Sequence, residues 1–285
     1  MLKKYYDKNN IMPLTLIKSK STLILVYFYL FMLVYWYLMN LDGLQNTLVN
    51  FIFGSLLAFV PIIGALFGFT ISKKWGFLSS KLGKAIFYVS TGLLFWGFAT
   101  IIFAYFNIVM QQDVPYPSIA DIFYLLLYVF YTLGAYQLMH VVGAKKSLKS
   151  IRGKIAVGIV PFIIFILTYF LFIGNLTESL EWLNLEFVLD LVYPFLDSIL
   201  LCFALLTLLL SFGQLGGRYR VAIYTLLVGF IVEYFADLGF SYTTSSESFY
   251  VGNWVDLLFL TSTFLVSFSI TLLSPVFIIN NGRTK

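Results

Sequence analysis

Histidine and cysteine are almost absent from this chain. Its 285 residues include one of each, His140 and Cys202. A disulfide needs two cysteines, so no disulfide framework can form within the chain. A zinc hydrolase site built on histidines is excluded as well, because such a site uses two or three of them. The chemistry of this protein must therefore rest on other side chains.

Charge is also scarce. Charged residues make up 11% of the chain, whereas a soluble domain contains about 25%. Hydrophobic residues make up 60%, and they recur in runs of about 20, the length that crosses a bilayer as a helix. The sequence therefore predicts an all-α fold, a polytopic integral membrane helical bundle. Eight transmembrane helices are expected, over residues 21–40, 48–71, 85–108, 119–143, 155–174, 187–211, 221–240 and 252–279.

These spans define the expected domain organisation. Residues 1–20 form a cytoplasmic basic N-terminal arm, residues 21–279 a single eight-helix transmembrane domain, and residues 280–285 a short cytoplasmic tail. Within the second span, Gly54, Gly64 and Gly68 predict close helix packing rather than chemistry.

Basic residues are missing from the interior of every span. All 18 lysines and arginines fall in the arm or in the segments after the second, fourth, sixth and eighth spans. The positive-inside rule then predicts a multi-pass protein of the cell membrane with both termini cytoplasmic. No lysine is available for a retinal Schiff base. The lipid bilayer is the expected partner, and the basic segments also attract anionic lipid headgroups. Nucleic-acid binding is not needed to explain the positive net charge.

The acidic residues follow the opposite distribution. Six of the 13 fall in the outer parts of the fourth, sixth, seventh and eighth spans, and they are Asp121, Asp190, Asp197, Glu233, Asp237 and Asp256. Acidic residues at membrane depth are functional-site candidates by default. Capping offers another explanation for Asp121 and Asp256, since each stands three residues after a polar helix-start residue. For Asp197 the capping explanation is weaker: Pro194 would be a first helical position with this acid in the next turn, but the residues before Pro194 are also apolar and belong to the expected span, 187–211.

Glu233 and Asp237 do not fit the capping explanation. They are four residues apart on one helix face, near the end of an outward-running helix where the dipole disfavours negative charge. No lysine or arginine is predicted on that side. These carboxyl groups must be protonated, bonded by hydroxyls such as tyrosine, exposed to a water-filled vestibule, or neutralised by a bound cation.

We expect an outward-facing acidic pocket, with candidate ligand- or cation-binding residues at Asp121, Asp197, Glu233, Asp237, Asp256 and Tyr193. No catalytic residue is assigned, the metal is not identified, and a bound cation is the one cofactor that the acidic residues suggest.

Three segments carry a resemblance to a known family. The phrases PYPSIADIFYLLLY, LVYPFLDSILL and NWVDLLFL resemble the multi-span N-terminal membrane sensory domain of prokaryotic diguanylate cyclases and histidine kinases. The likeness implies a sensory module. We expect no output domain in this chain, so that signalling requires a separate cytoplasmic signalling protein. The resemblance assigns no ligand and no binding residue.

Three functions compete at this point. A membrane sensory or ligand-binding module is favoured by the resemblance and by the acidic residues. An ion-coupled transporter or carrier would use intramembrane carboxylates as coupling sites, although the acids are expected near one face rather than at the midplane. An intramembrane enzyme would use paired carboxylates as acid and base, but no further group is singled out to assist them.

Overall fold

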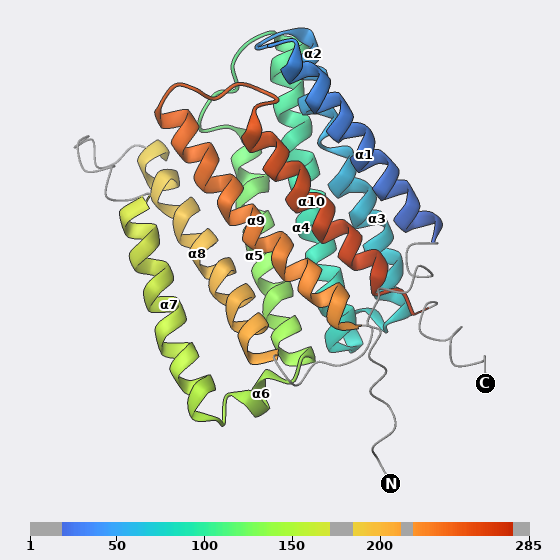
Figure 1. Ribbon diagram of the computed structural model, residues 1–285, viewed down its shortest axis with the longest axis vertical. Coiled ribbons are helices and arrows are strands. Elements are labelled where there is room, and N and C mark those ends of the chain that lie inside the picture. The colour runs from blue at the N-terminus through green and yellow to red at the C-terminus, as the bar shows by residue number, and fades with distance from the viewer. Residues whose placement is uncertain (1–18, 172–184, 212–218, 276–285) are drawn as a thin grey trace.

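The computed structural model describes residues 19–171, 185–211 and 219–275, and no strand occurs among them (Figure 1). The helices are α1 (Lys20–Leu41), α2 (Leu48–Leu56), α3 (Phe59–Lys74), α4 (Lys81–Ala104), α5 (Ile119–Val141), α6 (Ala144–Ser147), α7 (Ile151–Leu171), α8 (Leu185–Ser211), α9 (Tyr219–Ser245) and α10 (Trp254–Leu272). A π-helical turn, η2 (Tyr105–Met110), extends α4.

Polar side chains fix where several helices begin. Ser19 accepts the Thr22 N–H at the start of α1, and Ser80 accepts the Gly83 N–H at the start of α4. Ser118 and Asn253 cap α5 and α10 in the same way. A capping oxygen satisfies one of the free N–H groups of a first turn, so these residues set the helix boundaries.

Eight helical segments of the described chain are long and apolar enough to cross a membrane, with α2 and α3 counted together and α4 joined to η2. The predicted all-α fold with eight such helices is therefore confirmed. The largest differences in the boundaries are in the last two spans. The seventh span continues beyond residue 240 to Ser245. The eighth is shorter than expected, because Gly252 has a φ of +88° and Asn253 is the helix cap, and α10 ends at Leu272.

The helices form a closed circuit of neighbours. Going round it, α3 packs on α4, α4 on α5, α5 on α8, α8 on α9, α9 on α10, and α10 back on α3. Outside this circuit, α1 packs on α10 and α3, and α7 packs on α8 (Figure 1). Only 11% of the most apolar part of α7 is buried, against 61% for α8. The circuit therefore encloses the core, while α7 leaves most of its apolar surface uncovered.

Small residues bring α3 close to its neighbours. A Cβ on Gly64 would overlap the Ser267 side chain on α10, and a Cβ on Gly68 would overlap the Ser90 hydroxyl on α4. A Cβ on Gly54 would lie 2.7 Å from Val251. The prediction of close packing at these three glycines is confirmed.

Charge separates along the bundle. The basic residues with described side chains lie at the starts of α1, α4, α7 and α9 and at the end of α3, and they are Lys20, Lys73, Lys74, Lys81, Lys84, Lys149, Arg152, Lys154 and Arg220. Asp42, Asp113 and Glu247 lie in loops at the opposite end. We refer to these two ends as the basic end and the acidic end.

Candidate functional site: a buried carboxyl cluster

Three carboxyl groups meet inside the helix circuit, and we call Asp197, Glu233 and Asp237 the carboxyl cluster. Asp197 comes from α8 and the other two from α9. Asp197 and Glu233 are 2% and 1% exposed, and Asp237 is partly buried. Glu233 and Asp237 are one turn apart on the same face of α9, so both approach the same neighbouring helices.

The cluster lies deeper than the sequence suggested. Asp197 is close to the midpoint of α8, and Glu233 is close to the midpoint of α9. We expected both in the outer parts of their spans. For Glu233 the difference arises because α9 continues to Ser245, which moves its centre to Glu233. The bounds of α8 are nearly those expected, so Asp197 was already near the middle of the expected span. Asp237 lies one turn nearer the acidic end.

Pro194 is inside α8 rather than at its first turn, so the capping explanation does not hold for Asp197. The apolar residues upstream of it continue the helix back to Leu185. Proline lacks the N–H that would bond the carbonyl four residues earlier. The Pro194 carbonyl itself accepts the Ser198 hydroxyl at 2.8 Å. A locally weakened stretch of α8 therefore directly precedes Asp197.

Two aromatic side chains donate hydrogen bonds to the cluster. The Tyr128 hydroxyl on α5 donates to Asp237 Oδ2 at 2.7 Å, and the Trp96 indole on α4 donates to Glu233 Oε1 at 3.1 Å. Asp197 also interacts with Tyr128 and with Asp237. Four helices of the circuit thus contribute to one site, and two of its carboxyl groups are direct neighbours.

The fifth helix at the cluster is α10. Its Ser262 interacts with Glu233, while the Ser262 hydroxyl donates to the Gly229 carbonyl at 2.9 Å. No lysine, arginine or histidine is among the described groups that interact with the cluster. Its negative charge is therefore not balanced by a described protein cation.

Several polar atoms at the cluster lack a hydrogen-bond partner among the described residues. They are Asp197 Oδ1, Glu233 Oε2 and the hydroxyl of Tyr131, a fully buried residue on α5. Tyr131 lies within electrostatic range of Glu233. A buried polar atom without a partner is costly and calls for an explanation.

Asp121 and Tyr193 form a second group at the acidic end. The Ser118 N–H donates to Asp121 Oδ2 at 2.6 Å, which completes a capping box at the start of α5. The Tyr193 hydroxyl donates to Asp121 Oδ1 at 2.7 Å. Nearby, the Tyr116 hydroxyl donates to Asp190 Oδ1 at 2.7 Å. Asp121 therefore both caps α5 and connects it to α8.

We expect Ser118→Ala to lower the free energy of unfolding by about 0.5–2 kcal/mol, the usual effect of losing an N-cap. The Ser118 hydroxyl accepts the Ala120 N–H at 3.2 Å, and alanine cannot replace that bond. Denaturation in detergent micelles measures the change. Ser245→Ala is the control, because Ser245 is the last residue of α9 and its exposed hydroxyl only donates back to the Ser241 carbonyl. Equal stability of the two variants would contradict the capping role.

Asp256 has a capping function of its own. Its Oδ2 accepts the Gly252 N–H at 2.6 Å, beside the Asn253 cap of α10. Tyr124 lies within electrostatic range of Asp256, Asp237 and Glu233, so Asp256 is near the cluster without belonging to it. The six candidate residues thus divide into the carboxyl cluster, the Asp121–Tyr193 pair and Asp256.

Sequence reasoning missed Trp96, Tyr128, Tyr131 and Ser262. They occur on three helices, and only Tyr128 stands in a segment that sequence analysis singled out, where nothing marks it as a site residue. The chain contains 20 tyrosines and 5 tryptophans, and these residue types are common near span ends in membrane proteins for reasons unrelated to a site. Only the arrangement of the helices distinguishes the residues that contact the cluster.

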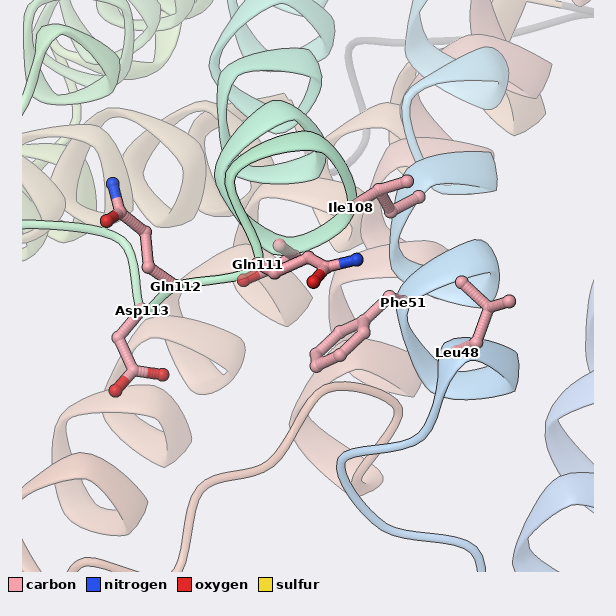
Figure 2. Close-up of a pocket in the computed structure, with 7 residues that line it drawn as sticks. Leu48, Phe51, Ile108, Gln111, Gln112 and Asp113 are labelled. Carbon is pink, nitrogen blue, oxygen red and sulfur yellow. The ribbon is translucent and has the colours of Figure 1, made fainter.

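Two hollows open near the acidic end of the bundle. One has a volume of about 440 Å³ and is lined by Leu48, Phe51, Asn107, Ile108, Gln111, Gln112 and Asp113 (Figure 2). The other, of about 510 Å³, lies between η2 and the starts of α5 and α8, and its lining is largely apolar but includes Asp121. Neither is lined by a member of the carboxyl cluster.

The geometry does not form a metal site. Among residues 19–171, 185–211 and 219–275, no group of three or more histidine, cysteine, aspartate or glutamate side chains is arranged to hold a metal ion. The carboxyl cluster brings three acidic residues near one another without that arrangement.

Comparison with known proteins does not assign a function, so the proposal below depends on the geometry of the site. No protein-family model, no curated protein and no solved structure matches the chain.

Proposed function

We propose that this chain is an integral membrane sensory or ligand-binding module whose ligand site is the carboxyl cluster. One observation carries the proposal: Asp197, Glu233 and Asp237 converge at mid-depth in the bundle, with no lysine, arginine or histidine among the described groups that interact with them. Ionisable groups buried at membrane depth are rare and mark functional sites. In this proposal the bundle crosses the cell membrane with its basic end in the cytoplasm.

The helices that carry the cluster also reach the basic end. From the cluster, α8 continues to Ser211, while α9 begins at Tyr219. A ligand that changes the repulsion between Asp197 and Asp237 would alter how α8 and α9 pack. Helices move as rigid units over such lengths, so the change would reach the basic end. There it would be available to a cytoplasmic signalling protein or to anionic lipid headgroups.

The depth of the cluster favours a second candidate, an ion-coupled carrier. Coupling-ion sites of secondary transporters lie near the bilayer midplane, and Asp197 and Glu233 lie near the midpoints of their helices. A carrier also needs a substrate site beside the ion. Neither of the two hollows includes the cluster in its lining, so the sensory module remains the preferred function.

Thermal melting in nanodiscs tests the ligand site. We expect at least one of four probes, namely sodium, calcium, magnesium or a change of buffer pH, to shift the melting temperature of the wild-type protein. A ligand at 100 times its dissociation constant adds about 2.7 kcal/mol of stability. The double variant Glu233→Gln with Asp237→Asn should lose the shift. Asp190→Asn should keep it, because Asp190 bonds Tyr116 at the acidic end.

The same samples test whether the site communicates with the basic end. A fluorophore attached to cysteine at exposed Ser150, in a protein carrying Cys202→Ser, should change its emission with the probe that shifts melting. Ser150 lies in the turn before α7, at the basic end. A wild-type protein that none of the four probes shifts has no ligand at this site, and the proposal would then fail.

A further inference from the structure

We propose that the ligand of the carboxyl cluster is the proton, with one proton held between Asp197 and Asp237 and a second on Glu233. This inference rests on the proposed function, because it names the ligand of the same site. Protons would leave to solvent when the site ionises and return when it is neutralised. The module would thus respond to the pH of the solvent that exchanges protons with the cluster.

The first argument is the contact between two carboxyl groups. Asp197 and Asp237 interact as neighbouring buried and half-buried side chains, and Tyr128 donates to Asp237 beside them. Two carboxylates that share a site cannot both ionise without strong repulsion, so one of them keeps a proton. That proton also makes a hydrogen bond between the two groups, since a pair of bare carboxylates contains no donor.

The second argument is the absence of a balancing charge. The titratable groups that interact with the cluster are Tyr124, Tyr128 and Tyr131 on α5 and Tyr234 on α9. Cys202 on α8 and Asp256 on α10 interact in turn with these tyrosines, and α4 contributes the Trp96 indole, which does not titrate. None of these is a cation. Burial of an ionised carboxylate is so unfavourable that the group neutralises instead.

The third argument comes from the unpartnered atoms. Glu233 Oε1 accepts the Trp96 N–H, whereas its Oε2 has no partner, and the buried Tyr131 hydroxyl in its electrostatic range has none either. Asp197 Oδ1 is also unpartnered. A proton on one of these oxygens turns an acceptor into a donor. The oxygens that lack a hydrogen-bond partner are therefore the atoms to which the proposed proton would bind.

Size distinguishes the proton from a metal ion. Sites for hard cations need several oxygen ligands arranged around the ion. Within the described residues, no group of acidic side chains has that arrangement. A proton needs only two oxygens close together, and Asp197 and Asp237 supply them.

Infrared difference spectroscopy of the protein in lipid nanodiscs tests the inference, with protons as the only probe. A protonated carboxyl group absorbs separately from a carboxylate. We expect the wild-type protein to show protonated-carboxyl absorption at neutral pH and to lose it in alkaline buffer. Asp197→Asn, Asp237→Asn and Glu233→Gln should each lose part of this signal, while the Asp190→Asn control should retain all of it.

The wild-type protein supplies a second measurement in case a variant does not fold. Trp96 donates to Glu233, so its fluorescence should change over the same pH range as the infrared signal, and Trp96→Phe should remove that change. The inference is overturned if wild-type protein shows no protonated carboxyl at neutral pH, or if all three variants keep the full signal. In either case the proposed function could still hold. It would be supported if a metal salt shifts the melting temperature of the wild-type protein and the double variant Glu233→Gln with Asp237→Asn abolishes that shift.

Discussion

Replacing Gly64 with alanine is expected to push α3 away from α10 and to lower the free energy of unfolding by at least ~1–3 kcal/mol, the usual range for overpacking. The new Cβ would overlap the Ser267 hydroxyl and Cβ, and it would lie 3.1 Å from the Ser267 Cα. A serine side chain is too short to move out of the way. The strain must therefore be relieved by separating the two helices, which also weakens the circuit that encloses the carboxyl cluster.

Gly158→Ala is the matched control for this prediction. Gly158 is likewise a glycine inside a long helix, α7, but a Cβ there would have no heavy atom within 4 Å. We expect its stability to stay unchanged or to rise by up to ~1 kcal/mol, because alanine favours the helix. Unfolding in mixed micelles with increasing denaturing detergent compares the two. Equal stability would show that α3 and α10 do not depend on the small residue.

A second large effect is expected from Tyr128→Phe, which should destabilise the protein by about 1–3 kcal/mol. Phenylalanine fills the same space but cannot donate to Asp237 Oδ2, which now accepts that hydrogen bond at 2.7 Å. A buried carboxyl oxygen then loses its donor. The same change should alter the pH at which the cluster titrates, since Tyr128 also reaches Asp197.

Tyr131→Phe provides the comparison, with the same substitution one turn further along α5. Its hydroxyl is buried and has no hydrogen-bond partner among the described residues, so we expect its removal to be neutral or stabilising. Melting and micelle unfolding of both variants measure the difference. If Tyr131→Phe were the more damaging of the two, the assignment of donors to the cluster would be wrong.

The architecture was largely predictable because lipid imposes strong constraints on sequence. A helix needs about 20 apolar residues to cross a bilayer, and the alternation of basic segments identified eight such helices. Local detail was harder to predict. The second span divides at Leu57 and Ala58 into α2 and α3. Pro61, in the first turn of α3, has no N–H to donate to the Leu57 carbonyl. The hydropathy of the span does not reveal this missing backbone hydrogen bond.

The candidate site was predictable only in part, because sequence determines residue type and approximate depth but not which helices face each other. Glu233 and Asp237 could be placed on one face from their spacing. The convergence with Asp197 depends on α8 packing beside α9, and the donors depend on α4 and α5 closing the circuit. The capping explanation offered for Asp121 agrees with its capping box, since capping depends on neighbouring residues alone, whereas Asp256 accepts the Gly252 N–H rather than that of Asn253.

The hydrogen bonds of α1 have a consequence for the order of assembly during synthesis. Thr22, Tyr29, Trp36 and Asn40 all bond residues between positions 252 and 271, on α10 or directly before it. Translation proceeds at about 5–20 residues per second, so α1 is complete on the order of ten to forty seconds before α10 emerges from the ribosome. Until then these polar side chains lack their partners on α10, so the docking of α1 on α10 is a late step in the assembly of the bundle.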